Sequence, residues 1–168
     1  MTKMISKVEG NVLVLEREFD APKDLVFSAF SQSEHLEQWW GPRGWNLTVC
    51  NIDFRVDGIW HYCMKCVDEK QGDFFGFESW GKGVYKEIIQ DEKIALIDYF
   101  SDSAGNEANG MPSTFVTLSF EENDGKTKLI NRAEYTSQEA LQTVLDMGME
   151  QGTNETWDRL EEHLASIK

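Results

Sequence analysis

The order of hydrophobic and polar residues divides the chain into an early strand, two short helices, a long region of strands and a helical C-terminal part. Residues 12–19 are rich in apolar and β-branched residues and predict the first strand. Pro22 suits a helix start, and apolar residues at helical spacing follow it over residues 25–30. A second short helix is predicted over residues 33–40, where a Gly-Pro pair ends it.

Strands are predicted for most of the next hundred residues. Six segments carry the signal, at residues 47–53, 54–67, 74–89, 94–100, 113–120 and 127–135. Trp60, Tyr62 and Met64 alternate along one of them and are therefore expected on one face of the sheet. Asp57-Gly58 within the same segment predicts a bulge or a sharp bend, because glycine tolerates the backbone that such a bend needs.

The period becomes helical after Ser137, with a short helix to about residue 147 and a long helix to the C-terminus. One face of the long helix carries Met149, Thr153, Trp157, Leu160, Leu164 and Ile167. Hairpin-connected strands form an antiparallel sheet whose apolar face must be covered, and this helix is the only predicted element long enough to cover it. We therefore predict one domain, residues 1–168, of the α+β class with a helix-grip fold. A curved antiparallel sheet of about seven strands would wrap the long C-terminal helix and leave an apolar cavity between them.

Charge and composition narrow the classes of partner. The formal net charge of -14 would repel nucleic acid and anionic membranes, so neither is expected to bind. The N-terminal residues lack the apolar core of a signal peptide, and no segment approaches the roughly 20 apolar residues that span a bilayer. Three cysteines, an odd number, favour a reducing compartment over a disulfide framework. A soluble, cytoplasmic protein is expected.

Aromatic residues are the main candidates for ligand binding. Nine fall on the elements expected around the cavity: Trp39, Trp40, Trp60, Tyr62, Phe75, Phe77, Tyr85, Phe100 and Trp157. Ligand pockets are mostly apolar and aromatic, with a few polar groups, but about half of this set is expected to be plain core packing. Met147 and Met149 would add an adaptable wall near the start of the last helix.

Asp98 is the one acidic residue set in an apolar strand. It shares parity with Ile94, Leu96 and Phe100. If that parity faces the cavity, Asp98 is a carboxyl group with a raised pKa and a potential acid or base. If the other face points inward, Asp98 is solvated, and the pattern alone leaves both readings open.

Other chemistry finds little support. Cys63 and Cys66 have the spacing of a metal or dithiol site, but residues three apart in a strand point to opposite faces, and no second pair completes a ligand set. His35 and His163 are expected on the surface, and no nucleophile motif accompanies them. We expect no metal and no cofactor, and we assign no catalytic residue.

Several segments together resemble a known family. They are residues 16–22, 25–30, 36–42, 57–60, 83–88, 114–118 and 153–160, in this order over nearly the whole chain. They resemble the family named after the homologue of the activator of the heat-shock-protein-90 ATPase, within the START/Bet v 1-like (SRPBCC) superfamily. The resemblance implies the helix-grip fold, and the superfamily includes carriers, cyclases, resistance proteins and co-chaperone modules. The chain departs from the family at Gln151-Gly152, where an aromatic residue is usual, which would widen the pocket or alter helix packing.

Three functions follow from these observations. The first is binding of a hydrophobic or aromatic small molecule in the cavity. The second is a cyclase- or hydrolase-like enzyme using the same pocket, with Asp98 or a tyrosine as its acid–base group. The third is a protein-interaction module with a chaperone partner, which an exposed apolar patch outside the cavity would favour. A homodimer is a further expectation, because the edge strands of an open sheet can pair across a two-fold axis.

Overall fold

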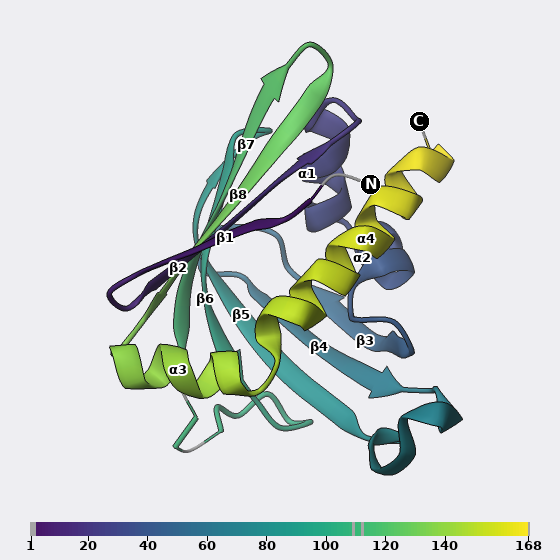
Figure 1. Cartoon of the computed structure of the whole chain (residues 1–168), viewed down its shortest axis with the longest axis vertical. Coiled ribbons are helices and arrows are strands. Elements are labelled where there is room, and N and C mark those ends of the chain that lie inside the picture. Colours follow the sequence, from purple (N-terminus) through teal and green to yellow (C-terminus); the bar gives the residue numbers. More distant parts are fainter. Residues whose placement is uncertain (1–2, 109, 112, 168) are drawn as a thin grey trace.

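A single curved antiparallel sheet grips the C-terminal helix (Figure 1). The computed structural model describes residues 3–108, 110–111 and 113–167. The strands are β1 (Ile5–Glu9), β2 (Val12–Phe19), β3 (Trp45–Ile52), β4 (Ile59–Cys66), β5 (Glu78–Ile89), β6 (Lys93–Phe100), β7 (Thr114–Asn123) and β8 (Lys126–Tyr135). The helices are α1 (Lys23–Ser31), α2 (Ser33–Trp39), the short 3-10 helix η1 (Glu69–Phe74), α3 (Gln138–Asp146) and α4 (Met149–Ile167). The sheet order is β1-β2-β8-β7-β6-β5-β4-β3, so the predicted α+β helix-grip fold is confirmed.

The sheet has one strand more than predicted within the described residues. β1 pairs antiparallel with β2 at the sheet edge, and all five of its residues are exposed. A strand that is exposed on both faces carries no alternation of apolar and polar residues, which is why the sequence pattern did not indicate it.

Two predicted strands begin later than expected. Of the two alternatives predicted for Asp57-Gly58, the structure shows the sharp bend, because both residues lie in the turn before β4 and not at a bulge inside a long strand. Asp57 has φ of 66°, and a Cβ added at Gly58 would lie 2.0 Å from the carbonyl oxygen of Asp53, so this tight turn separates β3 from β4. Likewise, the strand predicted over residues 74–89 starts only at Glu78, as β5, because Phe74 ends η1 and residues 75–77 form the turn that follows.

The long helix α4 lies across the concave face of the sheet (Figure 1). Trp157, Leu160 and Leu164 are buried on its inner side, at the spacing that the sequence predicted. Burial of each such side chain contributes about 1.5–3 kcal/mol relative to exposure.

An ion pair joins the same helix to β2. The side chain of Arg17 is 0% exposed, and its Nη1 lies 2.8 Å from Oδ1 of Asp158. Its Nη2 lies 3.3 Å from Oε1 of Glu161.

The helices α1 and α2 close one end of the sheet through an aromatic cluster. Trp39 is 0% exposed, donates a hydrogen bond of 3.1 Å from Nε1 to the carbonyl oxygen of Ala29, and packs edge-on against Phe30. At the other end, Ser137 caps α3 by accepting a hydrogen bond from the amide of Ala140. None of the described helices is long and apolar enough to span a membrane.

Candidate functional site

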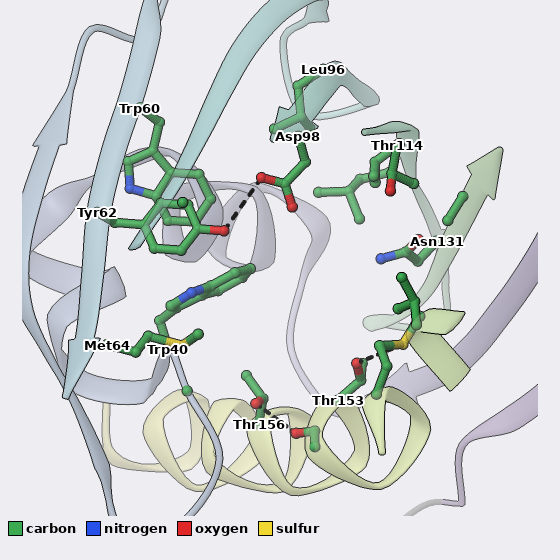
Figure 2. A pocket seen from close by; sticks show the side chains of 18 of the residues that line it. Trp40, Trp60, Tyr62, Met64, Leu96, Asp98, Thr114, Asn131, Thr153 and Thr156 are labelled. Carbon is green, nitrogen blue, oxygen red and sulfur yellow. Dashed lines mark hydrogen bonds between the residues drawn. The ribbon is translucent and has the colours of Figure 1, made fainter. Parts of the chain in front are cut away.

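A cavity of about 380 Å³ lies between α4 and the concave face of the sheet. Most of its wall comes from α4, from the segment after α2, and from strands β4 to β8 (Figure 2), and β2, α1 and α3 add Leu15, Phe30 and Val144. Side chains that line it include Phe30, Trp40, Trp60, Tyr62, Met64, Tyr85, Leu96, Asp98, Phe100, Thr114, Val116, Asn131, Ala133, Tyr135, Met149, Thr153, Thr156 and Trp157. Its lining is therefore largely apolar and aromatic, which is typical of small-molecule sites.

Three aromatic rings form one wall. Trp60 and Tyr62 alternate along β4 and are stacked at a tilt with their ring centroids 4.3 Å apart. Trp40, which follows α2, packs edge-on against both rings, at 4.8 and 5.9 Å. Gly81 on β5 makes room for Tyr62, because a Cβ at position 81 would lie 2.3 Å from the tyrosine ring. The paired strands thus hold the Tyr62 ring against the sheet.

Asp98 lies on β6, and its carboxyl group faces the cavity (Figure 2). Of the two orientations that the sequence left open for the Asp98 side chain, the structure therefore shows the one that faces the cavity. The Tyr62 hydroxyl donates a hydrogen bond of 3.3 Å to Oδ1 of Asp98, while Oδ2 points into the open space (Figure 2). Burial in this apolar site raises the pKa of Asp98 from its ordinary 3.8 to about 7, and the hydrogen bond from Tyr62 partly opposes that rise.

The phenols around Asp98 stay neutral. Burial and the neighbouring Asp98 carboxylate raise the pKa of Tyr62 well above its ordinary value. Burial likewise raises the pKa of Tyr85 and of Tyr135. Asp98 is consequently the group of the cavity wall whose charge changes near neutral pH.

Some other polar groups of the cavity wall have hydrogen-bond partners within the protein, and others have none. The hydroxyl groups of Thr153 and Thr156 donate within α4, to Sδ of Met149 and to the carbonyl oxygen of Gly152. By contrast, Oη of Tyr85 and Oδ1 of Asn131 are buried and have no hydrogen-bond partner among the described residues. Both atoms lie beneath the surface of the cavity wall, so a ligand in the open space would not contact them directly, and Figure 2 shows the amide nitrogen of Asn131 turned toward that space.

The segment after α2 is held in place from α4. Nη1 of Arg159 donates hydrogen bonds of 2.8 Å to the carbonyl oxygens of Gly41 and Trp45. The same guanidinium group also reaches the carbonyl oxygens of Pro42 and Gln38, at 3.3 and 3.4 Å. Because Trp40, Gly41 and Pro42 line the cavity, Arg159 fixes one of its walls.

Eight of the predicted binding residues line the cavity: Trp40, Trp60, Tyr62, Tyr85, Asp98, Phe100, Met149 and Trp157. The other four do not. Trp39 is a core residue of the helix pair, as described above. Phe75 and Phe77 are 51% and 55% exposed, because the chain turns at Gly76 before β5 begins. Met147 is 58% exposed, since it caps α3 and Gly148, with φ of 84°, then reverses the chain.

The sequence prediction missed several lining residues. Asn131, Ala133 and Tyr135 alternate along β8 and face the cavity, whereas Arg132 and Glu134 form an exposed ion pair on the other face. This alternation was available as a signal. Gly152 also lines the cavity, and a Cβ added there would meet nothing within 4 Å, so the chain has open space at this position of α4.

The cysteines and histidines lie apart from this site. All three cysteines are free, and Cys63 and Cys66 are buried. Nδ1 of His35 lies 2.9 Å from Nε2 of His163, so these residues form a half-buried pair between α2 and α4 and not the isolated surface residues expected. Within the described residues, no group of three or more His, Cys, Asp or Glu could hold a metal ion.

The family model of the activator of Hsp90 ATPase homolog 1-like protein matches residues 20–165. The crystal structure of protein Ms6760 from Mycobacterium smegmatis is similar at 26% identity and a TM-score of 0.84, over 99% of this chain and 96% of that chain. A solution structure from Staphylococcus epidermidis is similar at 29% identity and a TM-score of 0.82, over 98% and 96% of the two chains.

A further solution structure, from Arthrobacter aurescens, is similar at 26% identity and a TM-score of 0.85, over 98% of this chain and 91% of that chain. No curated protein sequence matches. The family match agrees with the fold and with the motifs that resembled this family in the sequence. The chain belongs to the family of activator of Hsp90 ATPase homolog 1-like proteins.

Proposed function

We propose that the protein binds an apolar, aromatic small molecule in the cavity between α4 and the sheet. The observation that carries this proposal is the cavity itself, with a volume of about 380 Å³ and a lining dominated by aromatic and aliphatic side chains. Ligand pockets usually occupy about 300–1,000 Å³ and combine such a lining with a few convergent polar groups. Here the polar groups include Asp98, Tyr62 and Asn131.

The ring geometry supports an aromatic ligand. Trp40, Trp60 and Tyr62 form a continuous wall, with centroids no more than 5.9 Å apart. A planar ligand would pack against this wall, with Met149 and Trp157 of α4 on its other side. Aromatic contacts of this kind contribute about 0.5–1.5 kcal/mol each beyond the area that they bury.

An enzymatic role in the same pocket is the second candidate. It is favoured by one observation, the carboxyl group of Asp98 with a pKa of about 7 and a tyrosine hydroxyl at 3.3 Å. A general acid or base works best with a pKa near the operating pH. Turnover of a bound ligand that Asp98→Asn abolishes, without loss of binding, would favour this role over simple binding.

A protein-interaction role has less support in the described residues. Phe74 and Phe77 are exposed and pack against Trp45 at 6.4 and 6.2 Å, so a small aromatic patch lies outside the cavity around η1. The homodimer and the chaperone partner expected from the sequence remain proposals, and this aromatic patch is the observation that favours a protein partner.

A thermal-shift screen tests the leading proposal. A ligand that binds the native state alone stabilises it by about 2.7 kcal/mol at a hundredfold excess over its Kd. We expect apolar aromatic compounds to raise the Tm of the wild-type protein. Gly152→Leu should abolish the response, because its side chain would project into the open space at the cavity wall. The Gly152→Leu substitution should not lower the free energy of unfolding, because a glycine within a helix is itself destabilising by about 0.5–1 kcal/mol relative to alanine.

The matched control is Gln151→Leu, which places the same side chain at the neighbouring, exposed position of α4. This variant should respond to ligands as the wild type does. No response of the wild type to a broad aromatic library, or an equal response of Gly152→Leu and the wild type, would rule out the cavity as the binding site.

A further inference from the structure

The cavity of the proposed function has a one-sided electrostatic character. Among the described residues that line it, Asp98 is the only acidic residue, and there is no lysine, arginine or histidine. The wall therefore offers no positive partner to an anionic ligand such as a fatty acid. An ionised carboxylate inside a largely apolar cavity is itself unfavourable unless a cation pairs with it.

The Asp98 carboxyl group has capacity for such a partner. Tyr62 is the described residue that donates to it, and that bond reaches Oδ1 alone. The second oxygen points into the open space of the cavity (Figure 2). A carboxylate accepts several hydrogen bonds, so a donor on a ligand could occupy Oδ2 without displacing Tyr62.

The rings beside Asp98 also suit a cation. Tyr62 joins the carboxyl group to the wall that Trp60 and Trp40 continue. The faces of tryptophan and tyrosine rings attract cations within about 6 Å, and more strongly where water is excluded. The net charge of the protein, -14, adds a long-range attraction for positively charged ligands.

We propose that the natural ligand is a lipophilic amine, whose ammonium group pairs with Asp98 beside the Trp40–Trp60–Tyr62 wall while its apolar body fills the cavity. This inference rests on the proposed function and specifies the chemical class of its ligand. The ammonium group donates to Oδ2, and the aromatic body packs between β4 and α4.

Binding of an amine and binding of a neutral ligand depend on pH with opposite signs. An alkylammonium group keeps its proton to about pH 10, so an amine needs the ionised form of Asp98. A neutral ligand with a hydrogen-bond acceptor needs the protonated form. The titratable groups facing Asp98 are Tyr62 from β4, Tyr85 from β5 and Tyr135 from β8, and the pKa of each is raised, so none of them ionises between pH 6 and 8.

The test is isothermal titration calorimetry with three probes that share one naphthalene body: 2-(1-naphthyl)ethylamine, 2-(1-naphthyl)ethanol and 1-naphthaleneacetate. We expect the amine to bind about tenfold or more tighter than the alcohol at about pH 8, and the acid most weakly. The affinity of the amine should rise up to about tenfold from pH 6 to 8 as Asp98 ionises. Binding near pH 7 should release protons, which titrations in buffers of different ionisation enthalpy detect.

Two variants separate the cavity carboxyl group from general surface charge. Asp98→Asn should remove the preference for the amine and the pH dependence while the alcohol still binds. Glu134→Gln removes the same charge from the exposed face of β8 and should behave as the wild type does.

The outcomes distinguish this inference from the function on which it rests. Two results would mean that the cavity binds small molecules but that the ligand is not a cation. One is that the alcohol binds as tightly as the amine. The other is that the affinity of the alcohol falls as the pH rises while the affinity of the amine does not rise. If the acid binds most tightly, or Glu134→Gln weakens the amine as much as Asp98→Asn does, the assignment of the ammonium site is wrong. If none of the three probes binds, both proposals fail for this class of ligand.

Discussion

Replacement of Asp98 by asparagine is expected to stabilise the protein at alkaline pH, by up to about 4 kcal/mol. The folded protein raises the pKa of this carboxyl group from 3.8 to about 7. A raised pKa means that the stability contributed by the protonated form is fully present below about pH 4 and is lost as the pH rises through 7. Asparagine cannot ionise, and its amide oxygen can still accept the hydrogen bond from Tyr62.

Urea denaturation at several pH values measures this effect. The free energies of unfolding of wild type and Asp98→Asn should agree near pH 4 and diverge between about pH 4 and 8, with the variant the more stable. The value of 4 kcal/mol is an upper bound, because water that enters the cavity solvates the ionised carboxylate. Glu134→Gln, on the exposed face, should show no such divergence. A variant of Asp98 that is less stable than the wild type at pH 8 would show that the ionised carboxylate has a partner in the free protein.

Removal of Arg17 is expected to have the second large effect. Arg17→Ala should lower the free energy of unfolding by about 3–5 kcal/mol, because the change leaves a void and separates a buried ion pair. The guanidinium group is fully buried under α4, and its contacts with Asp158 and Glu161 join that helix to β2. Denaturant titration of the free energy of unfolding measures the loss.

Arg17→Met is the matched comparison. Methionine fills most of the same space without a charge, and buried ion pairs are often replaced by apolar residues at little cost. We therefore expect Arg17→Met to lose much less stability than Arg17→Ala. A double-mutant cycle with Asp158→Asn should give a coupling of about 0.5–3 kcal/mol. Equal losses for the two Arg17 variants, without coupling to Asp158, would mean that the ion pair does not hold α4 to the sheet.

Much of the fold could be predicted from the sequence because each long element carries its own period. Trp60, Tyr62 and Met64 alternate along one strand, and Trp157, Leu160 and Leu164 recur at helical spacing, so sheet face and helix face were both evident. β1 carries no such signal, because both of its faces meet solvent.

Side-chain positions near turns could not be predicted in the same way. Phe75 and Phe77 lie in an aromatic segment that reads as a strand, yet the backbone at Gly72, with φ of 63°, and at Gly76 turns this segment away from the sheet. Met147 follows an apolar helix face, but the next residue reverses the chain. A hydrophobic pattern gives the periodicity of an element and does not give the residue at which it ends.

The orientation of Asp98 depended on packing between distant elements. Its strand is apolar at both parities, with Ile97 and Tyr99 on one and Leu96 and Phe100 on the other, so periodicity was uninformative. What decides the inward face is the pairing of β6 with β5, which sets Asp98 opposite Gly83 and within reach of Tyr62. Such pairing is a property of the whole sheet.

The most direct test of the central claim, a small-molecule site in this cavity, is amide NMR of the isotope-labelled protein titrated with the naphthyl amine and the naphthyl alcohol. Gly41, Gly81 and Gly152 line the cavity, and their amide signals should shift with saturation for both probes. Gly10 and Gly125, in the turns before β2 and β8, should stay unchanged and serve as internal controls. Shifts confined to residues outside the cavity lining, or no saturable shift with either probe, would contradict the account.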